Sequence, residues 1–565
     1  MQCQQCHQPF AVTDTENQFL SIVCPTIAGV PFPFHTPQLC PRCRTLRRCS
    51  FRNERILYHR KCDKTGKEII SIYKEATPFP VYDQKVWWSD QWDAMDYGRA
   101  YDFNQSFFAQ WQALQAAVPR LSLLSTNNEN SDYTNCVSYL KNSYLLFSSD
   151  YNQDCLYGVW VENSRDSVDN LVIDHSELTY YSFFSQNLYN CQFVLNSSQC
   201  TDSAFLYDCR NTKDCFMSVG LRNKQYCIEN KQYSREEYEQ KRLAINLKSH
   251  AQLTKYKHQF LELIKTKPRL YMDRNGRVEN STGNLMTDVE NCFDCFDITN
   301  SQDCSYSQGA MNSKNIQHCS FVFGEQGYEN CECVPNPQQS AFNINCYTGN
   351  NLWYCDTCMN NCQDCFGCIG LRHQQYCILN KQYTKAEYEE LLPKIIAQMK
   401  ADQSWGEFFP MTLSPFAFNE TTAYDYFPLT KERVTELGGC WHEAPETHRY
   451  HGQPTILDDI VSETEDVSQK ILACETCQKQ YRIIPQELRF YQKIGVALPR
   501  SCFDCRHRER LTWKNGWTLW DRTCAKCTKV LKSTYKSSSP EIIFCQECYQ
   551  QSLDQVAGFS AVCRL

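Results

Sequence analysis

A segment of twenty residues occurs twice in this chain, at an offset of 150 positions. Residues 220–239 (GLRNKQYCIENKQYSREEYE) return as residues 370–389 (GLRHQQYCILNKQYTKAEYE), and 14 of the 20 positions are identical. Self-similarity over such a length indicates a duplicated structural unit that buries its apolar faces against neighbouring units. The fold must therefore accommodate the same unit twice.

A finer rhythm of short β-prone pieces, separated by Asn, Asp, Ser and Gln, precedes each copy. The pieces begin at short and nearly regular intervals, often at a cysteine. The corners are almost free of Asn-Gly and Asp-Gly, which tight antiparallel hairpins require. We therefore expect two parallel β-solenoid-like arrays with stacked inward thiols, and an antiparallel sandwich is the alternative. The pieces begin near Tyr144, Cys155, Val168, Thr179, Cys191, Ser203, Cys215 and Tyr226, and near Cys292, Cys304, Cys319, Cys331, Phe342, Tyr354, Cys365 and Tyr376.

The spacing predicts coils of about 22 to 24 residues with two strands each, near residues 131–230 and 287–380. Each array leads into a helix with a capping-box signature, Ser234-x-x-Glu237 in one copy and Thr384-x-x-Glu387 in the other. Such a helix can cover the exposed edge at the end of an array. The expected fold is thus mainly β, with duplicated arrays and capping helices.

The chain has 37 cysteines in 565 residues, and twelve of them form paired CxxC motifs near its two ends. Two CxxC pairs supply the four thiolates that tetrahedral zinc requires, and they leave no coordination position open for catalysis. We predict three structural Zn²⁺ ions. Arginine-rich helical sequence follows the second pair of the first two sites, as in a treble clef, while the third site is closer to a zinc ribbon. The ligand sets are Cys3, Cys6, Cys40 and Cys43; Cys474, Cys477, Cys502 and Cys505; and Cys524, Cys527, Cys545 and Cys548.

The cysteines outside these three sets are expected to be buried thiols. A cluster within the second array could ligate metal, but cysteines continue with strand periodicity on both sides, which favours a buried thiol ladder. The cluster consists of Cys355, Cys358, Cys362, Cys365 and Cys368. The cysteines left unpaired at the ends are expected to be small buried hydrophobes; they are Cys24, Cys49, Cys62, Cys440 and Cys563.

Charge is distributed unevenly along the chain, whose net charge is -7. Residues 1–75 carry +5 and residues 471–565 carry +7, so the middle carries -19. If residues 44–58 form one helix, Arg44, Arg48, Arg52 and Arg55 lie on a single stripe, which could bind phosphates. The alternative is a solvated face, or pairing within the chain to Glu54 and the acidic body. The nucleic-acid-binding candidates are Arg42, Arg44, Arg47, Arg48, Arg52, Arg55, Arg506, Arg508 and Arg510.

An aromatic-rich segment at residues 76–120 contains Trp87, Trp92 and Trp111. Such rings can stack bases, but most rings of this kind fill a core, and we favour packing. Residues 104–117 have helical periodicity that ends before Pro119.

These features divide the chain into six segments. They are an N-terminal treble-clef-like module (1–75), an aromatic-rich helical segment (76–130), a first array with its capping helix (131–285), a second array with its helix (286–400), an aromatic and proline-rich segment with an acidic linker (401–470), and a double zinc module (471–565). There is no run of eighteen apolar residues, and the N-terminus lacks a signal-peptide profile. A cytoplasmic protein that does not enter membranes is expected.

Several motifs resemble those of a family of bacterial proteins with multiple zinc ribbons. They are Cys40-Pro-Arg-Cys43-Arg, Arg52-Asn-Glu-Arg55, Cys62-Asp-Lys-Thr-Gly-Lys67, Trp87-Trp88-Ser-Asp, the two Gly-Leu-Arg segments, and residues 502–511. The resemblance implies a cytoplasmic location and zinc at Cys3, Cys6, Cys40, Cys43, Cys474, Cys477, Cys502 and Cys505. It implies no activity and no substrate.

Three hypotheses of function follow. The first is a non-enzymatic zinc-binding scaffold whose basic modules bind nucleic acid, RNA before DNA. The second is a protein-interaction scaffold with structural zinc. The third is a carbohydrate-active β-solenoid enzyme, although no acidic pair, Ser/His/Asp set or phosphate-binding glycine loop is recognisable, which also argues against a small-molecule substrate.

Overall fold

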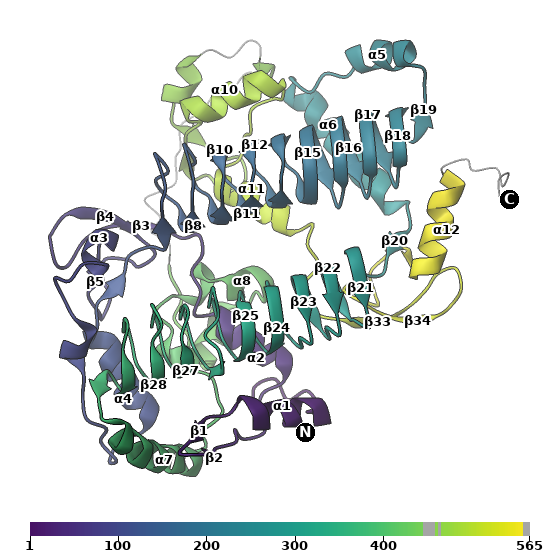
Figure 1. Ribbon diagram of the computed structural model, residues 1–565. Coiled ribbons are helices and arrows are strands. Elements are labelled where there is room, and N and C mark those ends of the chain that lie inside the picture. Colours follow the sequence, from purple (N-terminus) through teal and green to yellow (C-terminus); the bar gives the residue numbers. More distant parts are fainter. Residues whose placement is uncertain (444–457, 461–464, 557–565) are drawn as a thin grey trace. The chain divides into compact units, whose positions relative to one another are not determined.

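The computed structural model describes residues 1–443, 458–460 and 465–556. Most of the acidic linker and Cys563 lie outside these residues. The fold is mainly β, and it groups into two compact units. Unit 1 comprises residues 1–124, 272–442 and 516–519, and unit 2 comprises residues 125–271, 443–515 and 520–565. Each unit therefore combines one array with cysteine modules from a distant part of the sequence (Figure 1).

The array of unit 2, called array 1, is a stack of parallel strands (Figure 1). Gln153 is paired with Arg165, Val159 with Leu171, and Gln186 with Ser198. Each pairing joins position i to position i+12, and this interval is the length of one coil. The strands are β7 (Ser125–Thr126), β8 (Asn135–Ser138), β9 (Phe147–Asp150), β10 (Gln153–Leu156), β11 (Val159–Glu162), β12 (Arg165–Val168), β13 (Leu171–Asp174), β14 (Glu177–Tyr180), β15 (Phe183–Leu195), β16 (Ser198–Tyr207), β17 (Arg210–Val219) and β18 (Arg222–Ile228).

Array 2, in unit 1, has the same parallel architecture. Met286 is paired with Ile298 and Gln363 with Gln375, again i to i+12, although Asn350 is paired with Gln363 at i+13. Its first strand begins at Arg274, ahead of the predicted start. The strands are β21 (Arg274–Glu279), β22 (Gly283–Glu290), β23 (Cys295–Gln302), β24 (Met311–Gln317), β25 (Phe323–Tyr328), β26 (Ser340–Ala341), β27 (Asn350–Trp353), β28 (Gln363–Phe366) and β29 (Gln375–Ile378).

The predicted parallel solenoids are confirmed, but the predicted coil length is wrong, because it is about twice the observed one. The reason lies in the backbone. From Asn127 to Glu229, every third residue has a positive φ angle, so each coil turns at four corners. Left-handed backbone disfavours most L-residues, while Asn and Asp tolerate it comparatively well. This explains the Asn- and Asp-rich corners, and it makes the coil half as long as expected.

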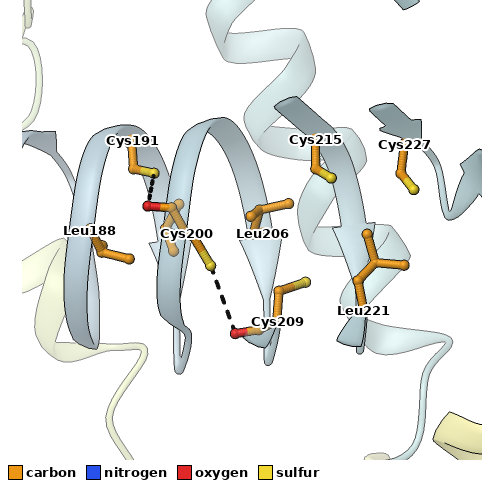
Figure 2. Packing of buried hydrophobic residues seen from close by; sticks show 9 residues of the cluster. Leu188, Cys191, Cys200, Leu206, Cys209, Cys215, Leu221 and Cys227 are labelled. Carbon is orange, nitrogen blue, oxygen red and sulfur yellow. Dashed lines mark hydrogen bonds between the residues drawn. The ribbon is translucent and has the colours of Figure 1, made fainter. Parts of the chain in front are cut away.

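One residue in three points into the coil, and it directly follows a corner. Figure 2 shows Leu188, Cys191, Cys200, Leu206, Cys209, Cys215, Leu221 and Cys227 lined up inside array 1. All eight are buried. The interior of such a narrow coil has room only for small and medium side chains, which accounts for the many inward Cys, Ser, Val and Leu residues.

Inward polar side chains also satisfy the backbone at the corners. The hydroxyl of Ser197 donates to Leu195 O (2.7 Å) and accepts from the N–H of Cys209 (3.0 Å), one coil further on. The Cys191 thiol donates to Cys200 O at 3.4 Å, and all cysteines of the described arrays are free thiols. The buried thiol ladder that the sequence predicted is therefore present.

Each array ends in the same way, as the repeated segment predicted. A short antiparallel hairpin pairs Cys227 with Gln232 at the end of array 1, and Cys377 with Gln382 at the end of array 2. A helix with a complete capping box follows each hairpin. The elements are β19 (Lys231–Gln232) and α5 (Arg235–Leu243), and β30 (Lys381–Gln382) and α7 (Lys385–Ala401).

The remaining elements surround the arrays. Unit 1 has α1 (Asp14–Val23), β1 (Thr26–Ile27), β2 (Val30–Pro31), α2 (Pro41–Cys49), β3 (Tyr58–Lys61), β4 (Glu68–Ser71), β5 (Val81–Tyr82), α3 (Gln84–Trp87), η1 (Ala94–Tyr97), α4 (Phe107–Ala117), β6 (Arg120–Leu121), η2 (Met411–Leu413), η3 (Phe418–Glu420), α8 (Thr422–Tyr426) and α9 (Lys431–Glu436). Unit 2 has α6 (His250–Lys265), β20 (Arg269–Leu270), η6 (Glu465–Gln469), β31 (Leu472–Ala473), β32 (Gln480–Tyr481), α10 (Pro485–Ile494), α11 (Phe503–Leu511), β33 (Trp520–Thr523), β34 (Val530–Ser533), β35 (Ile543–Phe544) and α12 (Gln546–Val556).

The rings of the aromatic-rich segment pack into the core of unit 1, which is the interpretation that the sequence favoured over base stacking. Trp87, Phe107 and Trp111 are fully buried, and Phe107 lies against Tyr354 and Phe366 of array 2. The predicted helix of this segment is α4. Trp88 and Phe103 are the most exposed aromatic rings of the segment.

We expect Ser197→Ala to destabilise unit 2 by about 1–3 kcal/mol, because the buried N–H of Cys209 loses its acceptor. Ser198→Ala is the matched control, because Ser198 is half-exposed and should cost at most about 0.5 kcal/mol. Urea unfolding followed by tryptophan fluorescence measures both. Equal effects of the two substitutions would contradict the role of the inward hydroxyl.

Candidate metal centres

Three groups of four cysteines come together at the predicted positions. They are Cys3, Cys6, Cys40 and Cys43; Cys474, Cys477, Cys502 and Cys505; and Cys524, Cys527, Cys545 and Cys548, and within each group all Sγ atoms lie within 4.8 Å of one another. The Sγ atoms of Cys6 and Cys40 are 3.7 Å apart, those of Cys477 and Cys502 3.8 Å, and those of Cys527 and Cys545 3.7 Å. A Zn–S bond of about 2.3 Å gives a tetrahedron with an edge of roughly 3.8 Å. The three groups therefore fit zinc.

The first CxxC pair of each group lies on the same tight turn. The N–H of Cys3 donates to Gln8 O, and the N–H of His7 donates back to Cys3 O. Cys474 with Lys479 and Gln478, and Cys524 with Lys529 and Thr528, form the same two hydrogen bonds. The fifth residue of each turn is left-handed (His7, Gln478 and Thr528). This turn directs both sulfurs of a pair to one side.

The second CxxC pair of each group begins a helix. Cys40 precedes α2, Cys502 precedes α11 and Cys545 precedes α12. A helix therefore follows the third site as well, where the sequence indicated a ribbon. The partial positive charge of a helix N-terminus stabilises a negatively charged thiolate cluster. All three sites thus share one local architecture.

Backbone N–H groups also point at the sulfurs. The N–H of Cys502 donates to Cys474 Sγ at 3.2 Å, and Cys40 and Cys545 donate in the same way to Cys3 and Cys524. Burial by itself raises the pKa of Cys474, but backbone hydrogen bonds from Cys502, Cys477 and Thr476 lower it to about 6. The thiolate form that binds metal is therefore favoured at this position.

Array thiols form no comparable group among the described residues. Cys355, Cys358, Cys362, Cys365 and Cys368 are completely buried and follow the coil rhythm. Their carbonyl contacts repeat from coil to coil, with Cys355 donating to Cys365 O and Cys358 donating to Cys368 O.

Helix α2 is shorter than the sequence predicted, and this changes the role of its arginines. It ends at Cys49, so Arg52 and Arg55 lie beyond it. The buried Asn53 amide donates to Ile56 O (2.8 Å) and Ile72 O (2.9 Å), and this turns the chain away from the helix axis. A continuous stripe of four arginines is therefore not formed.

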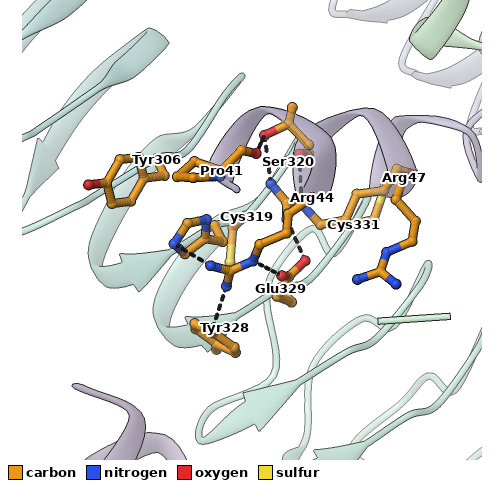
Figure 3. Close-up of polar contacts among 12 residues, drawn as sticks. Pro41, Arg44, Arg47, Tyr306, Cys319, Ser320, Tyr328, Glu329 and Cys331 are labelled. Atoms are coloured by element: carbon orange, nitrogen blue, oxygen red, sulfur yellow. Dashed lines mark hydrogen bonds and ion pairs between the residues drawn. The ribbon is translucent and has the colours of Figure 1, made fainter. Parts of the chain in front are cut away.

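Arg44 and Arg48 instead point into array 2, one helical turn apart. Their side chains are 2% and 0% exposed, and Arg44 pairs with one carboxylate oxygen of Glu329 while Arg48 pairs with the other. Figure 3 shows Arg44 beside Glu329. Arg44 also contacts the Tyr328 hydroxyl and Glu16 Oε1, the latter at 2.9 Å. Burial would raise the pKa of Glu329, but Arg44 and Arg48 hold it well below its usual range. We call this pair of arginines on one array carboxylate an arginine clamp.

Unit 2 contains a second arginine clamp at the equivalent positions. Arg506 Nε lies 2.8 Å from Asp169 Oδ2, and Arg510 Nη1 lies 2.6 Å from Asp169 Oδ1. Arg44 and Arg506 each follow the fourth cysteine of a group directly, and Arg48 and Arg510 follow four residues later. Asp169 and Glu329 are both left-handed corner residues of an array. The two modules are thus fastened to the arrays by the same device.

Each arginine clamp includes a second buried carboxylate from the module itself. Glu16 on α1 pairs with Arg44, and Glu487 on α10 pairs with Arg506 at 3.1 Å. Burial would raise the pKa of Glu16, but His318 and Arg44 hold it at about 2. Sequence reasoning missed Glu16 and Glu487. The signal was present, because both lie at the same distance along the chain from the first cysteine of their group.

The other candidate arginines have mixed environments. Arg52 is buried, pairs with Glu54 and Glu332, and covers the Phe321 ring. Arg47 pairs with Glu407 at 2.6 Å and is 13% exposed. Arg55 is half-buried, and Arg42 and Arg508 are exposed. Pairing within the chain, the alternative weighed for these residues, is therefore what the structure shows for Arg44, Arg47, Arg48, Arg52, Arg506 and Arg510.

A small pocket, open to solvent, lies in unit 1 beside Glu54, Arg55, Glu420, Thr421 and Asp425. Its carboxylates already have partners. Glu54 pairs with Arg52, and Glu420 accepts from the Tyr58 hydroxyl and from the N–H of Ala417. These contacts stabilise the surrounding loops.

Comparisons with known proteins identify no family and no function for this chain. No protein-family model and no curated protein matches the chain. One solved structure, a putative acetyltransferase from Desulfovibrio desulfuricans G20, is 8% identical over 50% of this chain and 82% of its own, with a TM-score of 0.10. A likeness this small carries no argument. Within the described residues, no helix is both long and apolar enough to cross a membrane.

We expect three zinc ions per chain in protein prepared without chelator, and two after Cys43→Ser. Structural zinc contributes on the order of 10 kcal/mol to the folding of small modules, so α2 should leave array 2 when its site is emptied. Cys440→Ser is the control, because Cys440 is exposed and belongs to none of the three groups. Elemental analysis that finds fewer than two zincs in the unaltered chain would contradict the assignment.

We expect Glu329→Gln to destabilise unit 1 by about 3–5 kcal/mol, because two buried guanidinium groups lose their counter-charge. Asp169→Asn should act similarly in unit 2. The control is Glu279→Gln, because the ion pair of Glu279 with Arg277 is exposed and screened by solvent and should contribute little to stability. Chemical denaturation measures all three, and similar losses for Glu329 and Glu279 would show that the arginine clamp is not important.

Proposed function

We propose that this chain is a non-enzymatic, zinc-dependent scaffold whose arrays provide an extended surface for a protein partner. The metal ions are structural in this proposal. Each fixes a module, and two of these modules hold an arginine clamp against an array. Zinc thereby maintains the shape of the arrays without taking part in a reaction.

The arginine clamps are the observation that carries this proposal. Nucleic-acid binding through the modules requires exposed guanidinium groups, since phosphates must reach them. Arg44, Arg48, Arg506 and Arg510 are at most 4% exposed and already neutralise Glu329, Asp169, Glu16 and Glu487. The basic residues that suggested a polyanion partner therefore support attachment of the modules to the arrays.

The outer corners of array 1 supply surface of the kind that proteins bind. Repetition from coil to coil presents similar side chains along a line, as in other repeat proteins. Tyr139 and Tyr151 lie one coil apart, are 50% and 57% exposed, and stack with ring centroids 4.8 Å apart. Exposed tyrosines of this kind are frequent anchors of protein interfaces.

The experiment compares capture of host proteins by the full chain and by Tyr139→Ala/Tyr151→Ala, followed by cross-linking mass spectrometry. We expect at least one protein to be cross-linked near this pair and its capture to fall about tenfold in the variant, equivalent to roughly 1.4 kcal/mol. The control is Asn187→Ala/Gln199→Ala, on the same corner at later coils. Equal capture by all three proteins would contradict a role for the array surface.

Nucleic-acid binding remains a second proposal, supported by the exposed Arg42 and Arg508. It predicts that single-stranded RNA binds the zinc-loaded chain and that Arg42→Gln/Arg508→Gln weakens the binding and its salt dependence. If RNA binds with that dependence while capture of proteins does not respond to the tyrosine substitutions, the nucleic-acid proposal replaces the first one.

A further inference from the structure

Residues 58–87 repeat the backbone of the metal modules with only one of their four cysteines, Cys62. The N–H of Cys62 donates to Lys67 O, and the N–H of Gly66 donates to Cys62 O, both at 2.8 Å. These are the two hydrogen bonds that define the tight turn at Cys3, Cys474 and Cys524. Gly66, like His7, is left-handed. The segment was interpreted from the sequence as ending a zinc module, with Cys62 as an unpaired buried thiol.

The second half of the segment also follows the metal modules. The N–H of Asp83 donates to Cys62 Sγ at 3.3 Å, as the N–H of Cys545 does to Cys524 Sγ. The N–H of Asp63 donates to Val81 O, as that of Ala525 does to Ile543 O. Asp83 then begins helix α3, in the place where Cys545 begins α12. Asp83 therefore occupies the position of the third ligand.

The sequence confirms the alignment at a constant offset between the two segments. Residues 58–87 and 520–549 are identical at nine of 30 positions: Arg60, Cys62, Lys64, Lys67, Ser71, Tyr73, Lys74, Pro78 and Gln84 match Arg522, Cys524, Lys526, Lys529, Ser533, Tyr535, Lys536, Pro540 and Gln546. The hairpins around the turn have the same register, with Tyr58 paired with Ser71 and Trp520 with Ser533.

Individual side chains make the same contacts in both segments. Arg60 donates to Lys74 O and to the Thr77 hydroxyl. Arg522 donates to Lys536 O and to the Ser539 hydroxyl, at the corresponding positions of the second segment. Strand β5 is paired with β6 just as β35 is paired with β20, in parallel. The two segments are copies of one module.

The copy at residues 58–87 has lost three of its four metal ligands. The positions of Cys527, Cys545 and Cys548 are occupied by Thr65, Asp83 and Val86. Apolar residues compensate for the metal. Ile70, Ile72 and Phe79 stand where the other copy has Lys532, Thr534 and Glu541, and they belong to a cluster with Tyr73, Val81, Leu123 and Phe416. Asp63 Oδ2 further links the halves by accepting from Val81 N–H at 2.6 Å.

Both copies pack against the end of an array, at the repeated Gly-Leu-Arg segment. In unit 2, a methyl group added at Gly220 would lie 2.7 Å from Leu553 Cδ2 of α12, and Asp208 binds both Arg222 and the Tyr549 hydroxyl. In unit 1, Arg372 donates to Trp88 O and lies over the Trp87 ring, which occupies the position of Tyr549. The same module therefore covers the same place in both units.

We propose that residues 58–92 are a fourth, metal-free module that holds the end of array 2 without zinc, whereas residues 520–553 hold the end of array 1 only with zinc. Loss of the third metal then exposes the Gly220 end of array 1, and the Gly370 end of array 2 stays covered. The chain thus contains a zinc-dependent cover on one array and a permanent cover on the other. This inference rests on the proposed zinc at Cys524.

A matched pair of substitutions tests the difference. Cys524→Ser should remove one zinc and increase amide exchange about tenfold at residues 220–222 and 524–529. Cys62→Ser should leave the zinc content unchanged and the exchange at residues 370–372 and 62–67 within about twofold of the unaltered chain. Loss of zinc from Cys62→Ser, or equal deprotection of both array ends, would overturn the proposal.

Restoring the ligands provides a second, independent test. In Thr65→Cys/Asp83→Cys/Val86→Cys, four thiols occupy the ligand positions of the module, and we expect one zinc more than in the unaltered chain. The control moves one thiol off the turn, with Lys64→Cys in place of Thr65→Cys, and should gain none. An unchanged zinc content in the triple-cysteine variant would overturn the proposal that residues 58–92 are a copy of the zinc module. Each variant is compared with the unaltered chain. If the zinc assignment itself is wrong, the unaltered chain will contain no zinc, and this result is distinct from a failure of the present proposal.

Discussion

The narrowness of the coil is the constraint on which the rest of this structure depends. A left-handed corner at every third residue leaves one inward side chain per triplet, and only small and medium-sized residues such as Ser197, Cys200 and Leu206 fit there. Large apolar side chains must therefore sit on the outside. Phe193 stacks on Phe205, and Phe342 on Tyr354, as outer corner residues of neighbouring coils. Arrays of this kind require other elements to cover their outer faces.

The cysteine modules and their neighbouring helices provide that cover. Helix α6 places Phe260 against Phe205, and α10 places Tyr491 against Tyr180. The arginine clamps hold α2 and α11 at a corner carboxylate in the same units. A buried guanidinium without its carboxylate is costly, so the clamps specify where each module attaches. A cysteine group, an arginine clamp and aromatic cover thus occur together in each unit.

The two units have the same arrangement of array and covering module, but the module at the end of the array is stabilised differently in each. Both have a repeated Gly-Leu-Arg end and a module upon it, but one module has a thiolate group and the other an apolar cluster around Tyr73. Zinc and apolar burial are alternative ways of stabilising so small a fold. The proposed difference between the two array ends rests on this contrast.

Local spacing in the sequence was enough to predict the duplication, the three groups of four cysteines, the parallel arrays and their capping helices. It did not reveal the true coil length, since a three-residue rhythm of small inward residues is hidden among polar corners such as Asn211 and Asp214. Nor did it show the partners of Arg44 and Arg506, because Glu329 and Asp169 lie far away from them along the chain. Whether an arginine beside a cysteine faces solvent or a buried carboxylate depends on which surfaces meet, and only the folded chain brings those surfaces together.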